Sequence, residues 1–277
     1  MANGNQLTPV EQLAFSTVRI ETDLNDGGIG TGTGFFYRLK QQDDGQHIPV
    51  IVTNKHAVKD ATKGRFRLTL QNAEGLPDIG NHMTIELDTF EQRWVPHPVD
   101  DVDLCVLPIA PLLRLAEEQG KKFFFITLDK SLLPTDEDYD SMFGMDDITM
   151  IGYPNGIWDE VNNFPVFRKG ITATNPKYDW NNKKEFLIDC ACFPGSSGSP
   201  VLLVNMGGYF TRSGLNLGST RIKLLGILYA GPQHTATGEI EIVDVPVAQR
   251  PILISRIPNN LGIVIKSELL KDFDAVF

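Results

Sequence analysis

Short apolar runs separated by turn-forming residues dominate the chain from Val18 onward. The runs alternate apolar and polar side chains or are rich in β-branched residues, and glycine, proline or Asn-Asp divides them. Examples are residues 34–37, 50–53, 66–70 and 83–87. Runs of this kind at intervals of roughly 8–12 residues are typical of β-barrels and β-sandwiches. The sequence therefore predicts an all-β fold.

Two helical segments interrupt this pattern. Residues 111–120 begin with proline and end with glycine, as a short helix does, and residues 267–273 form a closing helix. A second set of strands is expected between Ile148 and Ile265. The predicted organisation is a tail at 1–12, a first β unit at 13–110, a linker with an acidic loop at 111–145, and a second β unit with the closing helix at 146–277.

Charge and composition restrict the partners and the compartment. The net charge of −10 and the pI near 5 argue against binding to nucleic acid or to an anionic membrane. No apolar run approaches the length of a membrane span, and the first residues lack the features of a signal peptide. The three cysteines, Cys105, Cys190 and Cys192, do not make a disulfide framework and suit a reducing compartment. A cytoplasmic location is expected.

Residues 192–201 carry the strongest chemical signal. The segment reads Cys-Phe-Pro-Gly-Ser-Ser-Gly-Ser-Pro-Val, and apolar strand residues follow it. Such a turn can present a serine hydroxyl beside backbone N–H groups that stabilise an oxyanion. On composition alone, Ser196, Ser197 and Ser199 are all candidates for the nucleophile.

A nucleophilic serine needs a histidine base, and a carboxylate must orient that histidine. His56 follows directly on a predicted strand, with small and apolar residues behind it. The other histidines lie in polar or proline-flanked contexts and are His47, His82, His97 and His234. We therefore expect His56 to be the base.

Three aspartates, Asp100, Asp101 and Asp103, compete for the role of the acid. An uninterrupted apolar strand begins directly after Asp103, which favours that residue. Asp101 is the alternative, but it would place Asp103 inside the strand, where burial of a second charge is costly. No paired histidines or cysteines occur at metal-ligand spacing, so no metal and no cofactor are expected.

With these segments in place, the chain resembles a trypsin-like serine peptidase, most closely of the HtrA-like branch. The matching segments appear in the family's order, together span about residues 13–270, and are 32–36, 52–58, 103–107, 151–154, 189–200 and 262–265. The resemblance implies a double β-barrel with the active site in the cleft between the barrels. It implies Ser197 as nucleophile, His56 as base, Asp103 as orienting acid, and the N–H groups of Gly195 and Ser197 as the oxyanion hole.

Departures from the family pattern bear on regulation. Ser196 stands where secreted relatives carry the aspartate that receives a new N-terminus, so activation by propeptide cleavage is not expected. No peptide-binding PDZ module is expected after the closing helix. Regulation would then come from a partner protein, from oligomerisation or from loops. The acidic stretch 136–140 could be a docking surface, although a solvated loop is the simpler interpretation.

The substrate is expected to add to the strand at 225–231, with Tyr229, Ala230 and Gly231 beside the first pocket. Small or apolar residues map to the walls of that pocket and are Cys192, Phe193, Ala230 and Ile263. The sequence thus predicts a serine endopeptidase that acts on proteins or peptides through an acyl-enzyme and prefers an apolar residue before the cleaved bond. The alternative is a catalytically silent binding or regulatory module with the same fold.

Overall fold

Seven strands form one antiparallel sheet in the computed structural model, which describes residues 7–231, 233–239, 252–258 and 260–277. Their order across the sheet is β5-β4-β1-β2-β3-β7-β6. The bounds are β1 Thr17–Leu24, β2 Ile29–Leu39, β3 Ile48–Thr53, β4 Ala61–Gln71, β5 Pro77–Asp88, β6 Val95–Pro96 and β7 Cys105–Pro108. This sheet is the first of the two predicted β units.

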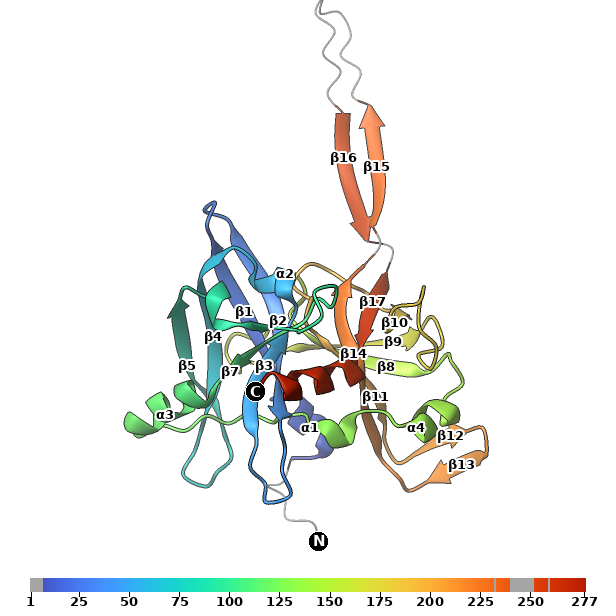
Figure 1. Ribbon diagram of the computed structural model, residues 1–277, viewed down its shortest axis with the longest axis horizontal. Coiled ribbons are helices and arrows are strands. Elements are labelled where there is room, and N and C mark those ends of the chain that lie inside the picture. The colour runs from blue at the N-terminus through green and yellow to red at the C-terminus, as the bar shows by residue number, and fades with distance from the viewer. Residues whose placement is uncertain (1–6, 232, 240–251, 259) are drawn as a thin grey trace, which may run out of the picture.

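Six later strands close into a barrel in the order β10-β17-β14-β11-β8-β9. The bounds are β8 Asp147–Gly152, β9 Val166–Thr172, β10 Glu185–Asp189, β11 Pro200–Asn205, β14 Arg221–Ala230 and β17 Leu261–Lys266. The sheet and the barrel stand side by side (Figure 1). The prediction of an all-β, trypsin-like fold with a linker helix and a C-terminal helix is confirmed; these helices are α3 (Ala110–Glu118) and the 3-10 helix η4 (Ser267–Ala275).

One apolar core crosses the boundary between the two units. It contains Phe35 and Val52 of the sheet, Ile151 and Ile227 of the barrel, and Phe273 of η4, all of them fully buried. Each such side chain contributes about 1.5–3 kcal/mol when it leaves water. This shared core packs the two units against each other.

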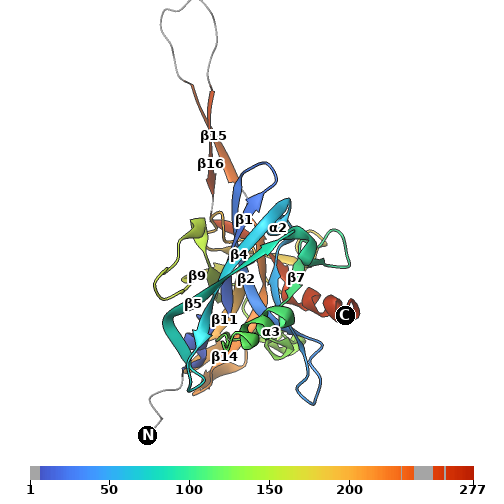
Figure 2. The same cartoon turned by 90° about the vertical axis from the view of Figure 1, so that its left-hand side faces the viewer.

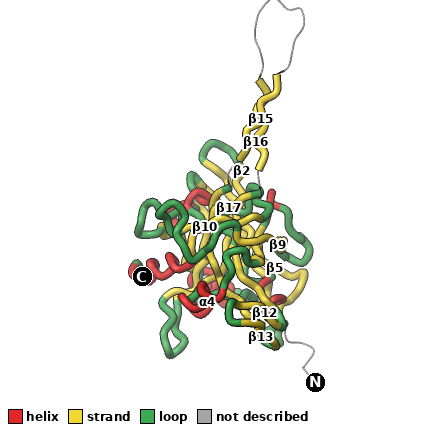
Figure 3. Tube along the Cα trace, turned by 90° about the vertical axis from the view of Figure 1, so that its right-hand side faces the viewer, coloured by secondary structure: helices red, strands yellow, loops and turns green. Residues whose placement is uncertain are grey.

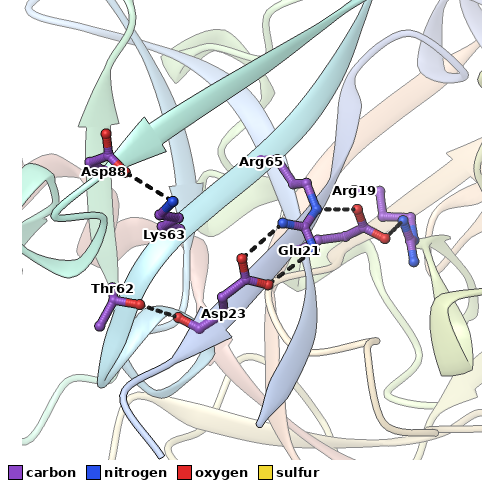
Figure 4. A network of polar contacts seen from close by, with 7 residues as sticks. All are labelled: Arg19, Glu21, Asp23, Thr62, Lys63, Arg65 and Asp88. Carbon is purple, nitrogen blue, oxygen red and sulfur yellow. Dashed lines mark hydrogen bonds and ion pairs between the residues drawn. The ribbon is translucent and has the colours of Figure 1, made fainter. Parts of the chain in front are cut away.

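An ion network of partly exposed side chains joins β1 to β4 (Figure 4). Arg65 donates to both carboxylate oxygens of Asp23 at 3.0 Å and to Glu21 at 3.2 Å. Glu21 also pairs with Arg19. The register of the strands places Glu21 directly opposite Arg65, so the network follows from the pairing of β1 with β4.

Two hairpins extend the barrel. The pair β12 (Gly208–Thr211) and β13 (Gly214–Leu217) lies at one end of the molecule, as Figure 3 shows. The pair β15 (Gln233–Glu239) and β16 (Ile252–Pro258) stands away from the body, which Figure 2 shows from the side. His234 lies on β15, where the structure describes no side chain.

Several helices stand where the sequence predicted irregular chain. Part of the predicted tail forms α1 (Pro9–Leu13), whose start is capped by Thr8 and Glu11. The predicted acidic loop is instead the short helix α4 (Asp136–Ser141), capped by Thr135 and Asp138. The remaining helical turns are α2 Lys55–Val58, η1 Glu91–Arg93, η2 Lys130–Leu132 and η3 Pro154–Gly156. Within the described ranges, no helix has the length and apolar character needed to cross a membrane.

Candidate functional site

The chain holds His56 against Asp103 where β3 ends and α2 begins. Three consecutive residues donate to the loop before β7: Asn54 to the Asp103 carbonyl at 2.8 Å, Lys55 to the Asp100 carbonyl at 3.1 Å, and the His56 N–H to Asp103 Oδ1 at 3.1 Å. The His56 ring meets Asp103 Oδ2 through Nδ1 at 2.5 Å. The structure therefore brings Asp103 to His56, whereas Asp101 is exposed and makes no hydrogen bond or ion pair with the ring among the described residues.

This contact fixes the tautomer of the His56 imidazole. A carboxylate only accepts hydrogen bonds, so Nδ1 carries the proton and Nε2 has a free lone pair. The second oxygen of the same carboxylate receives the His56 backbone N–H. Both the ring and the main chain of this residue are thus held by one aspartate. The His56 side chain is 46% exposed, so Nε2 can reach a substrate.

Two consecutive β-turns shape the segment after Cys192. The Ser196 N–H donates to the Phe193 carbonyl, and the Ser199 N–H donates to the Ser196 carbonyl, both at 3.0 Å. The third residue of each turn is glycine in the left-handed region, with φ +85° at Gly195 and φ +86° at Gly198. Type II turns require this conformation and favour glycine there. At position 198 there is also no room for a side chain, because a Cβ on Gly198 would lie 1.9 Å from the Thr33 carbonyl oxygen.

The turns place the three candidate serines in different surroundings. Ser196 is 1% exposed, and its hydroxyl accepts a hydrogen bond from Arg168 Nη2 at 2.7 Å. Ser199 is fully buried, and its hydroxyl has no partner among the described residues. Ser197 alone of the three is partly exposed. A nucleophile must meet its substrate, so this geometry favours Ser197.

The Pro194–Gly195 peptide is oriented by a contact on its far side. The Pro194 carbonyl accepts the Asn155 N–H at 2.6 Å. In a trans peptide the N–H points away from the preceding C=O, so the Gly195 N–H is turned away from Asn155. Over the part of the chain that the structure describes, neither the Gly195 N–H nor the Ser197 N–H has an acceptor. Two free donors next to a partly exposed serine make an arrangement suited to an oxyanion.

Thr33 of β2 anchors the same turn from the other β unit. Its N–H donates to the Ser197 carbonyl at 2.9 Å, and its hydroxyl donates to the Gly195 carbonyl at 2.8 Å. The hydroxyl also accepts the Tyr153 N–H at 3.1 Å. One residue of the sheet therefore fixes both carbonyls that flank Ser196.

Gly32 lies between the turn and the histidine helix. A Cβ at this position would lie 3.2 Å from the Ala57 Cβ and 3.9 Å from the Ser197 carbonyl oxygen. The residue after His56 and the carbonyl of Ser197 are thus near neighbours. No hydrogen bond joins His56 Nε2 to Ser197 Oγ among the described contacts. Such catalytic bonds often tighten only when substrate is bound.

The predicted substrate strand lies at the end of β14, beside the turn. The Gly198 N–H donates to the Leu228 carbonyl at 2.8 Å, and the pairing of β14 with β17 is irregular between Leu228 and Ala230. Tyr229 lies in this irregularity and donates through its hydroxyl to Glu185 at 3.0 Å. Burial raises the pKa of that phenol, and the hydrogen bond to Glu185 adds to the effect. Tyr229 also lines a pocket of about 230 Å³ that includes Asp103.

Cys192 packs into the space left by two glycines. A Cβ on Gly262 would lie 2.7 Å from the Cys192 sulfur, and one on Gly231 would lie 3.8 Å from the Cys192 Cβ. Burial raises the pKa of this thiol to about 12, so it is neutral near pH 7. The structure therefore places the predicted pocket wall at Cys192, as a neutral thiol, next to Gly231, which was predicted to lie beside the pocket.

The remaining histidines have other surroundings. His97 is buried, accepts the Val99 N–H at Nδ1, and donates through Nε2 to the Leu269 carbonyl at 3.1 Å, which ties η4 to the sheet. His47 is exposed and contacts a carbonyl of its own turn. No three His, Cys, Asp or Glu side chains group as metal ligands in the described ranges.

A family model described as a trypsin-like peptidase domain matches residues 32–208, which is more than half of the chain. The chain belongs to this family. The match includes His56, Asp103 and Ser197 and ends before Tyr229. A comparison with curated protein sequences finds no match.

Solved structures similar to this trypsin-like peptidase domain include three proteases. HtrA-type protease AlgW with a tripeptide is 15% identical with a TM-score of 0.46, and the match covers 96% of this chain and 62% of that one. A serine endoprotease from Yersinia pestis is 16% identical with a TM-score of 0.47, covering 96% and 64%. The active form of a protease from M. tuberculosis is 13% identical with a TM-score of 0.45, covering 95% and 81%. The chain spans less than two thirds of the length of the first two.

Three residues that were not predicted from the sequence hold the segment 191–199 of this trypsin-like peptidase domain, which we call the nucleophile turn because it carries the predicted nucleophile, Ser197. They are Thr33, Asn155 and Arg168. Thr33 lies inside the segment 32–36, on which the family resemblance partly rests. This position is the only feature of the sequence that points to a role for Thr33 in the site. Asn155 begins an Asn-Gly pair, a common turn sequence, but nothing local connects it to Pro194. Arg168 has no sequence signal at all.

Proposed function

We propose that the chain is a serine endopeptidase that cleaves peptide bonds through an acyl-enzyme. The observation that carries the proposal is a partly exposed Ser197 beside two N–H groups that lack acceptors in the described structure, with the oriented His56 on the neighbouring helix. Membership of the trypsin-like peptidase family supports it. The assigned roles are those expected from the sequence: Ser197 nucleophile, His56 base and Asp103 orienting acid.

The mechanism follows from these positions. Ser197 Oγ attacks the substrate carbonyl while His56 Nε2 takes its proton. The resulting imidazolium is stabilised by Asp103, which stays ionised. The negative charge on the carbonyl oxygen is met by the N–H groups of Gly195 and Ser197. His56 then gives the proton to the leaving amine, and water attacks the acyl-enzyme with His56 again as base.

Substrate would bind along Tyr229, Ala230 and Gly231 as an added strand. The Cys192 thiol at the pocket wall is neutral, so it offers no charge to pair with a lysine or arginine before the cleaved bond, and an unpaired charge there would be costly to bury. We propose a preference for small or medium apolar residues at that position. Cleavage of a peptide library mainly after lysine or arginine would contradict this preference.

A fluorophosphonate probe tests the nucleophile directly. The parent protein and Ser199→Ala are expected to be labelled, whereas Ser197→Ala is expected to remain unlabelled. Ser199→Ala is a matched control, because it removes a hydroxyl two residues away that has no partner in the described structure. Hydrolysis of a fluorogenic peptide with an apolar residue before the bond should follow the same order.

The alternative is a catalytically silent binding module. A parent protein that folds but neither reacts with the probe nor hydrolyses peptides would favour that alternative. Capture of a peptide by Ser197→Ala without turnover by the parent would point the same way.

A further inference from the structure

Arg168 of β9 contacts the nucleophile turn at both of its ends. Its Nη2 donates to the Ser196 hydroxyl at 2.7 Å, and its Nη1 donates to the Ala191 carbonyl. The stretch between these two acceptors is Cys192 to Gly195, which includes the peptide whose N–H belongs to the proposed oxyanion hole. One rigid guanidinium therefore spans the segment that must keep its shape.

The charge of Arg168 is not neutralised by an acid in the described ranges. No carboxylate there lies within ion-pair distance of it. Its Nε is buried and has no partner among the described residues. Burial lowers the pKa of the guanidinium, which starts from a very high value and so stays protonated. A half-buried cation without a counter-ion is costly, and hydrogen bonds to a carbonyl and a hydroxyl recover only part of that cost.

The planar guanidinium is suited to this double contact. Its N–H groups form a fixed fork, so two acceptors bound to it are held at a set separation. A lysine has one ammonium nitrogen on a flexible stem and cannot reproduce that fork. The chemistry required is thus specific to arginine.

Two other contacts reach the turn from different sides. Asn155 holds the Pro194 carbonyl, and Thr33 holds the carbonyls of Gly195 and Ser197. Neither contact fixes Ala191 or the Ser196 side chain. If Arg168 were lost, Asn155 would be the only one of these three residues that still held the stretch from Ala191 to Pro194, through the Pro194 carbonyl. A tilt of the Pro194–Gly195 peptide about that contact would turn the Gly195 N–H out of the hole.

We propose that Arg168 is a positioning residue that clamps the nucleophile turn in its reactive shape, in place of a charge delivered by a newly cut N-terminus. The proposal rests on the proposed peptidase function. Ser196, which stands where a carboxylate would receive such a terminus, instead accepts a hydrogen bond from an arginine of the same chain. The turn is then assembled as soon as the chain folds.

The first test compares Arg168→Met with Arg38→Met. Arg38 is a matched control: it is also half-buried, it donates to the Thr127 hydroxyl, and no acid pairs with it in the described structure. Arg168→Met should lower kcat by about tenfold to a hundredfold. This decrease is smaller than the one caused by removing an oxyanion-hole donor altogether, because the Gly195 N–H is still present. KM should stay nearly constant, because substrate binds to the β14 edge. Arg38→Met should match the parent.

Two further variants separate positioning from folding. Arg168→Lys keeps the charge and should give an intermediate kcat. Ser196→Ala removes one acceptor, and the double variant with Arg168→Met should be no slower than Arg168→Met alone, because both changes break the same contact. A kcat for Arg168→Lys equal to the parent's would overturn the need for a fork. A loss confined to substrates with glutamate before the bond would mean that Arg168 binds substrate instead.

Hydrogen exchange supplies a measurement that does not need turnover. Amides in residues 191–199 should exchange faster in Arg168→Met than in the parent or in Arg38→Met, while the barrel strands keep their protection. Equal exchange in all three proteins would refute the clamp. An inactive parent with the expected change in exchange would refute the peptidase proposal and leave the clamp standing.

Discussion

Replacing Thr33 by valine removes one hydroxyl and keeps the shape of the side chain. In the folded protein that hydroxyl donates to the Gly195 carbonyl at 2.8 Å and accepts the Tyr153 N–H at 3.1 Å. Both partners are buried, and no other described group satisfies them. The backbone bond from Thr33 to the Ser197 carbonyl is not touched by the change. The variant therefore isolates one side-chain anchor of the nucleophile turn.

The expected loss of stability follows from the two groups left without partners. A buried polar group that loses its only hydrogen bond costs about 1–3 kcal/mol, and a carbonyl tolerates the loss better than an N–H does. We expect Thr33→Val to lower the free energy of unfolding by about 2–4 kcal/mol. Because the Gly195 peptide also loses its anchor, kcat should fall about tenfold, which corresponds to about 1.4 kcal/mol.

Thr22 provides the matched control. It lies on β1 of the same sheet, it is 1% exposed, and its hydroxyl has no partner in the described structure. Thr22→Val removes a buried, unsatisfied hydroxyl and should leave stability unchanged or raise it by about 1 kcal/mol.

Urea denaturation followed by tryptophan fluorescence measures the difference, together with peptide hydrolysis for kcat. If the two valine variants unfold within about 0.5 kcal/mol of each other, a spread typical of surface changes, the anchoring role of Thr33 is wrong. An unchanged kcat in a destabilised Thr33→Val would refute only the link to the oxyanion peptide.

Three further results are expected. Asp103→Asn should lower kcat by about 10⁴-fold with little change in KM, whereas Asp101→Asn should match the parent in the same hydrolysis assay. Alkylation of folded Cys192 by iodoacetamide at pH 8 should be slow, because burial raises the pKa of its thiol to about 12; mass spectrometry before and after unfolding measures this. The hydrogen bond from Arg65 lowers the pKa of Asp23 below 3.8, so the pair contributes stability above that pH and loses it as the pH falls. Asp23→Asn should therefore lose less stability than the parent between pH 4 and pH 2, as thermal unfolding would record.

The sequence was enough to select a candidate base, a candidate acid and a short list of candidate nucleophiles, because each of these residues lies in a recognisable local context. His56 follows a strand, Asp103 precedes one, and a Pro-Gly turn carries the serines. Burial separates the three serines that composition alone leaves equivalent, and it supports Ser197 as the proposed nucleophile. All three candidates are serines in the same short segment, and they differ only in their position. The two turns bury Ser196 and Ser199 and leave Ser197 partly exposed.

Two short helices were not predicted, although the sequence contains the capping signals for both. Thr135 directly precedes the predicted acidic stretch 136–140, and Asp138 follows it by three residues, which forms a capping box. Asp138 forms an ion pair with Lys223, and Asp140 forms one with Lys177. Two of the negative charges of this stretch are therefore paired within the protein. The predicted tail likewise contains a capping box that starts α1.

The anchors of the turn could not be predicted in the same way. Thr33 lies 162 residues before Gly195 and 120 residues before Tyr153, and a threonine in a strand carries no mark of such partners. Arg168 looks like any polar residue on an alternating strand. Contacts between distant segments depend on how the two units pack, which is a property of the assembled core.

That dependence has a consequence for how the site is held together. The nucleophile turn receives one anchor from the sheet, through Thr33, and two from the barrel, through Asn155 and Arg168. His56 and Asp103 belong to the sheet alone. If Ser197 and His56 act together as we propose, their relative position is set by the contact between the two units, which the shared apolar core and Thr33 maintain. Loosening that contact should separate base from nucleophile while each unit still keeps its own strands, so turnover is expected to be more sensitive to this boundary than secondary structure is.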